Sequence, residues 1–285
     1  MNVSISVILT TCLDSHLLSK VITSILSQKL VNLELIVVVD NPSKFKLRTS
    51  AAIMDNSAAT NFLVYQNSRN RGQAASLNKG IKAARFDFVA IADDDDYWVD
   101  QYKLIKQINY LNEYNSCSGK PCVAVSSMFY LNTEGVILKS AFSPTFSHDA
   151  IICSQPCDFT PYNPMTHSST VFIKKFLLAV DLYDENLRRS QDLDLWLRLL
   201  SFGELHVLRE KMIVYNLANK SLSKRISNFI KDLYYESIIW SRYDVQSWHY
   251  LRSKLTRSLR ALFFKLASLP RRFLEYLKSY NHNLQ

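Results

Sequence analysis

Glycine is scarce in this chain, with only five copies among 285 residues. These glycines lie too far apart to form a Gly-rich phosphate loop or the closely spaced glycines of a dinucleotide-binding turn. This scarcity excludes proteins that hold phosphate in a glycine cradle. Any phosphate bound here must therefore be held by a metal ion and by side chains.

Long apolar runs are also missing. No uncharged run reaches the roughly 18 residues that would suggest a transmembrane helix. The first residues carry no positive charge ahead of their apolar part, so they make a poor signal peptide. We expect them to form a first strand instead.

Cysteine occurs five times. Two close pairs are present, Cys117 with Cys122 and Cys153 with Cys157, but their spacing misses the usual zinc-ligand pattern and no histidine joins them at ligand spacing. Reduced thiols are the favoured interpretation, and they are typical of cytosolic proteins. We therefore expect a cytoplasmic location.

Negative charge is rare near the C-terminus. Residues 220–285 hold 13 basic and 4 acidic residues, whereas residues 1–219 hold 21 of each, so the whole net charge of +9 belongs to the C-terminal segment. So sharp a break predicts a body over 1–219 and an extension with a different role over 220–285.

The body has an alternating pattern. Strand-like runs at 5–9, 33–39, 62–65 and 88–92 alternate with helical periodicity at 17–26 and 72–84. This alternation predicts an α/β fold with a Rossmann-like, mostly parallel sheet flanked by helices. Further along, the sequence predicts a helix at 101–114, a hairpin at 123–139, loops at 140–167, a strand at 169–173, a helix at 192–202 and two short strands at 205–208 and 212–217.

Four consecutive aspartates, Asp93 to Asp96, follow the apolar run 88–92. Adjacent carboxylates repel one another, and a divalent cation would stabilise them. A buried strand would deliver them to its carboxyl end, where open α/β sheets bind ligands. The pattern predicts a Mg²⁺ or Mn²⁺ site beside a phosphate-bearing substrate.

Asp40 follows the predicted strand at 33–39 and would lie at the same sheet edge. In isolation, Asp-Asn-Pro-Ser is better explained as a solvated turn. The second acidic cluster at this edge favours a binding residue, because a carboxylate can accept a base N–H or ribose hydroxyls.

A third acidic position is Asp192, in the first turn of a predicted helix. The simpler explanation is that its charge stabilises the helix N-terminus, and spacing alone favours this explanation.

Five segments carry a resemblance to a known family. They are Val-Ile-Leu-Thr-Thr at 7–11, Glu-Leu-Ile-Val-Val-Val-Asp at 34–40, Gly-Gln-Ala-Ala-Ser-Leu-Asn-Lys-Gly-Ile at 72–81, Phe-Val-Ala-Ile-Ala-Asp-Asp-Asp-Asp-Tyr-Trp at 88–98 and Gln-Asp-Leu-Asp-Leu-Trp-Leu-Arg at 191–198. In this order the chain resembles glycosyltransferase family 2, the inverting sugar-nucleotide transferases of the A-type fold, over about residues 3–216. The resemblance makes 1–219 the catalytic domain.

The resemblance implies roles for individual residues. Thr10 and Asp40 match positions that bind the nucleoside, with the aspartate typically on uracil, which makes a UDP-sugar the expected donor. Asn78 and Gly80 match the helix beneath the nucleotide, and they too are assigned to donor binding.

The remaining roles concern the metal and the reaction. Asp95 matches the direct ligand of Mn²⁺ or Mg²⁺, Asp93 lies nearer the ribose and also serves the metal, and Asp192 matches the general base. The acceptor side is assigned to Asp96, His167 and Trp196.

The chain departs from the family pattern at several positions. Cys12 and Leu13 stand where an aromatic residue and an asparagine are usual, and Gln191 replaces a glutamate before the base. The frequent Arg-x-His is missing near Tyr215, which puts a third protein ligand for the metal in question.

The implied reaction is a single displacement in which Asp192 removes a proton from an acceptor hydroxyl. The family suggests glycan or lipid-linked acceptors and bacterial cell-surface polysaccharide or lipopolysaccharide assembly. Two alternatives stay open: an inactive sugar-nucleotide-binding family member, and a nucleotidyltransferase, although the latter usually has a glycine loop that is missing here.

The basic extension carries leucines at three- and four-residue spacing from Leu251 to Leu269. Helices packed on the body would explain this stripe, and so would a helix lying on an anionic membrane surface. We expect peripheral contact with the cytoplasmic face of the membrane. We expect no nucleic-acid binding, because the body is neutral and lacks a recognised motif.

Overall fold

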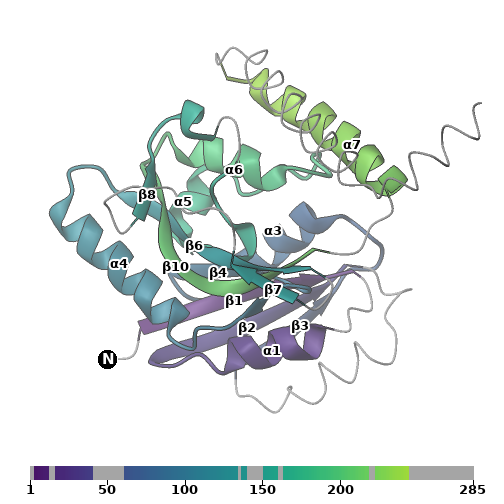
Figure 1. Cartoon of the computed structure of the whole chain (residues 1–285). Helices are drawn as coiled ribbons and strands as arrows, with labels where there is room; N and C mark the ends of the chain where they lie inside the picture. The colour runs from purple at the N-terminus through teal and green to yellow at the C-terminus, as the bar shows by residue number, and fades with distance from the viewer. Residues whose placement is uncertain are drawn as a thin grey trace, which may run out of the picture.

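The computed structural model describes residues 3–12, 17–40, 61–133, 136–139, 150–159, 163–217 and 222–243 (Figure 1). It confirms an α/β architecture with one large sheet flanked by helices. The first elements are β1 (Val3–Thr11), α1 (Leu18–Leu26), β2 (Val31–Val39), β3 (Phe62–Gln66), α3 (Gln73–Ala83), β4 (Phe88–Asp93) and β5 (Tyr97–Trp98). The later elements are α4 (Lys103–Cys117), β6 (Cys122–Thr133), β7 (Val136–Lys139), β8 (Ala150–Cys153), β9 (Val171–Ile173), α5 (Lys174–Ala179), α6 (Gln191–Leu199), β10 (Glu204–Leu217) and α7 (Leu222–Trp240).

The first half of the sheet is parallel, in the order β3-β2-β1-β4. Its central strands are buried on both faces and rich in valine, isoleucine and leucine, as a parallel sheet covered by helices requires. The register pairs Thr10 with both Val38 and Asp93. The ends of three strands therefore meet at one edge.

The second half of the sheet is mixed. β9 runs antiparallel to both β4 and β6, β6 runs parallel to β10, and β5, β7 and β8 add antiparallel pairs. The expectation of two short strands at 205–208 and 212–217 is wrong, because β10 is continuous. Register shifts between Leu208 and Ile213 accommodate the residues between the two predicted strands without ending the strand.

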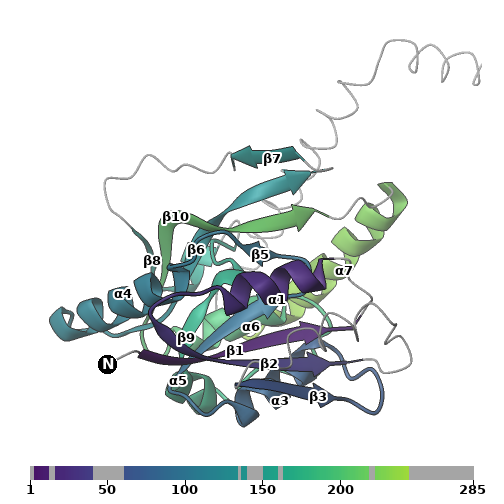
Figure 2. The same ribbon diagram turned by 90° about the horizontal axis from the view of Figure 1, so that it is seen from below.

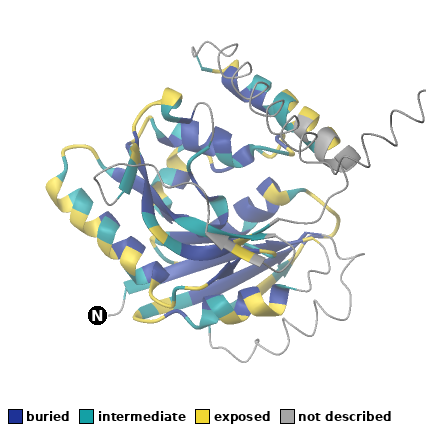
Figure 3. Cartoon of the chain, viewed as in Figure 1, coloured by how far each residue is buried: buried dark blue, intermediate teal, exposed yellow. Residues whose placement is uncertain are grey.

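Two hydrophobic clusters cover the two faces of the sheet. Figure 2 shows the helices around the sheet, and Figure 3 shows that its central strands are largely buried. Helices α1 and α4 pack on one face, and α3, α5 and α6 on the other. Gly80 lets α3 approach β1 closely, since a Cβ there would lie 2.4 Å from the Ile8 side chain. Each fully buried leucine or isoleucine stabilises the fold by about 1.5–3 kcal/mol.

Helix α7 begins the predicted basic extension. Ile239 and Trp240, at its end, are fully buried against the α6 side of the body. No helix in the described part of the chain is long and apolar enough to cross a membrane. The leucine stripe predicted for residues 251–269 lies outside the described residues, so the division at residue 219 stays a prediction.

Candidate active site

The carboxyl edge of the parallel strands opens into two adjoining cavities. We call the first the aspartate cavity, of about 500 Å³; its lining includes Thr10, Cys12, Asp40, the four aspartates Asp93 to Asp96, and Arg188. We call the second the amide cavity, of about 460 Å³; its lining includes Phe129, Asn163, His167, Gln191 and Asp192. Gln73, Asp93 and Tyr215 line both cavities and form a shared wall.

Asp40 is held firmly at the end of β2. Its carboxylate accepts hydrogen bonds from the backbone N–H groups of Arg71 and Gly72, each at 2.9 Å, and from the side chains of Asn67 and Ser76, also at 2.9 Å. Only one of these four bonds goes to Oδ2, and a carboxylate oxygen has two lone pairs. Asp40 thus fixes the loop before α3 and retains acceptor capacity on Oδ2.

Asp93 and Asp95 are the members of the acidic run that suit a cation. Asp93 lies on the shared wall, and Asp95 is exposed. Asp94, in contrast, accepts a 2.6 Å hydrogen bond from the Thr11 hydroxyl. Burial, followed by the charges of Asp95 and Asp93, raises the pKa of Asp94 to about 7.

Asp96 turns into the protein. It is buried and accepts a 2.6 Å hydrogen bond from the Ser168 hydroxyl and a 3.0 Å bond from the backbone N–H of Asn216. Burial, and then the charges of Asp93 and Asp95, raises its pKa well above the ordinary value. Asp96 therefore joins β10 to the segment at Ser168. It lines the aspartate cavity and not the amide cavity, and its acceptor-side role stays a prediction.

The donor set at this edge fits a hard divalent cation. Asp93 and Asp95 supply carboxylate oxygens of the kind that Mg²⁺ and Mn²⁺ prefer. No group of three His, Cys, Asp or Glu side chains forms a metal cage among the described residues. A cation would thus take its other ligands from substrate phosphates and water, as Mg²⁺ commonly does.

Asp192 lies in the first turn of α6 and lines the amide cavity. The Asn163 side-chain amide donates a 3.0 Å hydrogen bond to its Oδ2. Ser190 occupies the N-cap position of α6, but its side chain does not cap the helix and its hydroxyl lies 3.5 Å from the Glu236 carboxylate instead. The φ of Ser190 is 54°, an uncommon conformation for a non-glycine residue that sets the direction in which α6 begins.

His167 lines the amide cavity and contacts both Asp93, on the shared wall, and the buried Tyr183. Its Nδ1 lies 3.5 Å from the Asp93 carboxylate, and its Nε2 lies 3.0 Å from the Tyr183 hydroxyl. Burial acts to lower the pKa of His167, but the carboxylates, Asp93 first, outweigh it and raise the pKa. The ring is therefore held in place between β4 and the loop before α6.

Two glutamine side chains link the acidic run to the helix of Asp192. The Gln191 amide donates to Gln73 at 2.8 Å, and the Gln73 amide donates to Asp93 at 2.8 Å. This chain joins the first residues of α3 and α6 to the end of β4. In the sequence, Gln191 was notable only as a departure from the family pattern. In the structure it helps to position Gln73 and Asp93.

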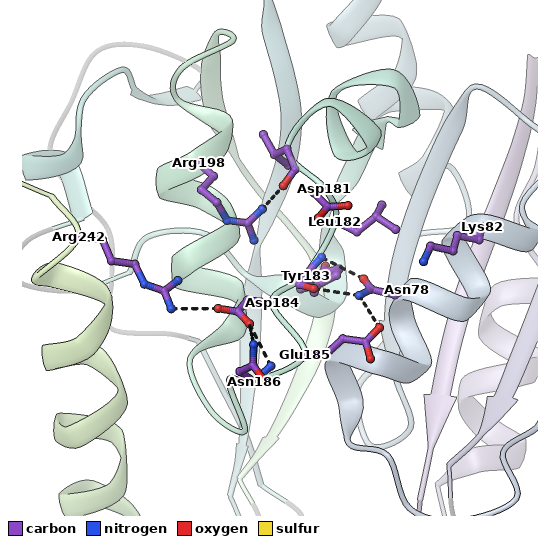
Figure 4. A pocket seen from close by; sticks show the side chains of 11 residues that line it. Asn78, Lys82, Asp181, Leu182, Tyr183, Asp184, Glu185, Asn186, Arg198 and Arg242 are labelled. Carbon is purple, nitrogen blue, oxygen red and sulfur yellow. Dashed lines mark hydrogen bonds and ion pairs between the residues drawn. The ribbon is translucent and has the colours of Figure 1, made fainter.

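Asn78 and Gly80 line neither cavity, so their expected part in donor binding stays a prediction. The Asn78 side chain exchanges 2.9 Å hydrogen bonds with the backbone of Tyr183 and donates to Glu185 at 3.2 Å (Figure 4). It lines a separate pocket between α3 and the loop before α6. Both residues support the site from behind, since they position α3 against that loop and against β1.

Trp196 also lies away from the acceptor position expected for it. It is fully buried and stacks on Phe172 with ring centroids 5.4 Å apart. The aromatic residues in the amide cavity are instead Phe129 and Tyr215, whose centroids are 5.4 Å apart. Helical periodicity could have identified Trp196 as a core residue, since it shares the apolar face of α6.

Several site residues escaped prediction from the sequence. Gln73, Asn163, Arg188 and Tyr215 line the cavities, and Thr11 bonds to Asp94. Tyr215 and Asn216 belong to β10, and the Asn216 side chain also donates to the Asp95 carbonyl. The pairing of β10 with β6 and β5 brings them here, and no local pattern marks it.

The fold and this edge site define a glycosyltransferase of the A-type fold. The sequence model of the family described as Glycosyl transferase family 2 matches residues 6–163. The chain belongs to this family, as its motifs predicted.

Relatives and solved structures agree with this classification. An uncharacterized glycosyltransferase of Methanocaldococcus jannaschii is 26% identical over 71% of this chain and 67% of its own length. Another, from Rickettsia bellii, is 25% identical over 78% of this chain, which spans only 31% of that protein.

Two similar structures show the same fold. TarS of S. aureus, in complex with UDP, has a TM-score of 0.62 at 16% identity, over 89% of this chain and 71% of that one. A mannosyltransferase from Pyrobaculum calidifontis, in complex with GDP-Man and Mn²⁺, has a TM-score of 0.60 at 13% identity, over 98% of this chain and 79% of that one.

Proposed function

We propose that this glycosyltransferase moves a sugar, with inversion, from a nucleotide-diphospho-sugar to a hydroxyl acceptor. The observation that carries the proposal is the shared wall. Asp93 and Asp95, the cation ligands we propose, and Asp192, the base we propose, line adjoining cavities that have Gln73, Asp93 and Tyr215 in common. A donor in one cavity and an acceptor in the other would meet at this wall.

The residues of the amide cavity suit proton removal. Asp192 would accept the proton of the acceptor hydroxyl while that oxygen attacks the anomeric carbon. Asn163 donates to one carboxylate oxygen, Oδ2, and thereby orients the group. A Mn²⁺ or Mg²⁺ ion held by Asp95 and Asp93 would supply positive charge that stabilises the diphosphate leaving group.

The aspartate cavity suits a nucleotide. Asp40 retains acceptor capacity for a base N–H or a ribose hydroxyl, and Thr10 lines the same cavity. We propose a UDP-sugar as the donor, which matches the UDP complex of TarS, while the mannosyltransferase with GDP-Man makes GDP-sugars the alternative to test.

A donor panel tests the proposal. Full-length protein would be incubated with UDP- and GDP-sugars, Mn²⁺ and candidate glycan acceptors, and the released nucleotide identified by chromatography. Release of nucleoside diphosphate together with a product of inverted configuration is expected. Release of pyrophosphate from a parallel incubation with UTP or GTP and a sugar 1-phosphate would indicate a nucleotidyltransferase instead. Binding of an NDP-sugar without release would indicate an inactive family member.

We propose a glycan or lipid-linked acceptor in bacterial cell-surface polysaccharide or lipopolysaccharide assembly, at the cytoplasmic face of the membrane. The support is the basic sequence of 220–285. Flotation with anionic liposomes would compare the full chain with a variant in which Arg252, Lys254, Arg257, Arg260 and Lys265 become glutamine. Equal flotation of the two proteins would contradict membrane contact through this segment.

A further inference from the structure

Arg188 is the only cationic side chain among the described residues that line the aspartate cavity. It shares this cavity with five carboxylates, those of Asp40 and of the run Asp93 to Asp96. Its side chain is exposed, so a ligand in the cavity can reach it. The cavity is therefore strongly acidic except at this one position.

The local backbone provides a specific place for the Arg188 guanidinium. Nη1 donates a 2.9 Å hydrogen bond to the carbonyl of Arg71. A Cβ on the next residue, Gly72, would lie 2.4 Å from Nη1, so any side chain there would displace the guanidinium. Gly72 also has φ +94°, which favours glycine.

The same loop connects Arg188 to the nucleoside end of the cavity. The backbone N–H groups of Arg71 and Gly72 donate to Asp40, while the carbonyl of Arg71 accepts from Arg188. One short segment thus positions a carboxylate suited to a base or ribose and a guanidinium suited to phosphate. A nucleoside diphosphate has these two parts in one molecule.

The proposed reaction creates negative charge at the phosphate end. The acceptor oxygen loses its proton to Asp192 and forms a bond to the anomeric carbon. The bond from that carbon to the β-phosphate oxygen breaks, and its electron pair stays on the oxygen. The leaving nucleoside diphosphate therefore carries one more negative charge than it did in the donor.

We propose that Arg188 binds the donor diphosphate and stabilises the charge that develops on the leaving group. This inference rests on the proposed function and assigns its phosphate contact to a residue of this chain. Preformed donors aimed at developing charge act mainly on the transition state. Loss of Arg188 should therefore lower kcat as well as affinity for the diphosphate.

The test compares nucleotides that differ by one phosphate. Calorimetry with Mn²⁺ would measure UDP and UMP, and GDP and GMP, on full-length wild type, Arg188→Ala and Arg188→Lys. In Arg188→Ala we expect the preference for diphosphate over monophosphate to fall at least about tenfold, and kcat for donor turnover to fall about 10- to 100-fold. Arg188→Lys should lie between wild type and alanine, because it keeps the charge and loses the planar fork.

Arg189→Ala is the matched control. Arg189 is the neighbouring arginine, forms an ion pair with Asp232 of α7 and does not line the cavity. Its diphosphate preference should equal that of wild type.

An unchanged diphosphate preference in Arg188→Ala would overturn the inference. The proposed function would still stand in that case, provided that the wild-type protein turns over the donor. If the wild type neither bound nor cleaved any sugar nucleotide, the proposed function would fail and the inference would fall with it. Thermal melting of each variant separates loss of binding from loss of folding.

Discussion

The aspartate cavity and the amide cavity differ in chemistry and in the way the chain builds them. The aspartate cavity lies mainly at the ends of parallel strands and is lined by carboxylates and one arginine. The amide cavity is lined by amides, aromatic rings and His167, most of them from loops and from the mixed half of the sheet. The parallel half thus supplies the cavity richer in carboxylates, which we propose for the nucleotide, and the mixed half the cavity with fewer carboxylates, which we propose for the hydroxyl acceptor.

The largest effect is expected from a substitution that alters the amide cavity alone. Asp192→Asn should lower kcat about 10³-fold, because the acceptor proton loses its base. Calorimetry with UDP and Mn²⁺ should give wild-type affinity, since Asp192 does not line the aspartate cavity. Near-normal turnover by this variant would remove Asp192 from the mechanism.

A second substitution alters the aspartate cavity alone. Asp95→Asn should weaken nucleotide binding in the presence of Mn²⁺ about 10- to 100-fold, and leave binding without metal nearly unchanged. Asp94→Asn is the control within the acidic run, because Asp94 accepts a hydrogen bond from Thr11 and is not one of the proposed cation ligands. Equal affinities with and without Mn²⁺ in the wild type would contradict a metal role at this edge.

A third pair of changes tests the shared wall. Tyr215→Ala should raise KM for both donor and acceptor, by up to about tenfold, because its side chain lines both cavities. Phe129→Ala should raise KM for the acceptor only, since Phe129 lines only the amide cavity. Initial-rate kinetics with each substrate varied in turn decide this, and an acceptor-only effect of Tyr215→Ala would show that the two cavities are separate.

The smallest effect concerns the interior behind the amide cavity. Lys103 is fully buried and donates to Gln107 at 2.8 Å, and the Gln107 amide donates to the carbonyls of Val125 and Ser169. Burial lowers the pKa of Lys103 well below its ordinary value, although Asp100 partly opposes this. At pH values between the lowered pKa and the ordinary lysine pKa of 10.5, the unfolded chain therefore binds a proton that the folded chain lacks.

Within that window the free energy of unfolding should rise with pH, by at most about 1.4 kcal/mol per pH unit. Urea titrations at several pH values between 7 and 9.5 would measure the slope in wild type and in Lys103→Met. The Met variant should show a shallower rise. Equal slopes would mean that Lys103 does not titrate differently in the folded and unfolded states.

The sequence predicted the aspartate cavity better than the amide cavity, for a physical reason. A carboxylate directly after an apolar strand is visible locally, and a parallel sheet brings such strand ends together, so Asp40 and Asp93 could be placed at one edge. Tyr215 and Asn163 reach the site through long-range pairing and loops, which leave no periodic signal. The acceptor-side role of Trp196 was expected only from the resemblance to the family. Its position on the apolar face of α6 would have indicated that it is buried.

Helix α7 also bears on where this protein can be divided and recombined. Its end is buried through Ile239 and Trp240. Arg242, just after the helix, forms ion pairs with Asp184 and with Asp194, which lies in the same helix as Asp192. A chimaera that exchanges the C-terminal segment between relatives should therefore be joined after Tyr243. A junction at residue 219 would remove this support from α6 and confound loss of anchoring with loss of catalysis.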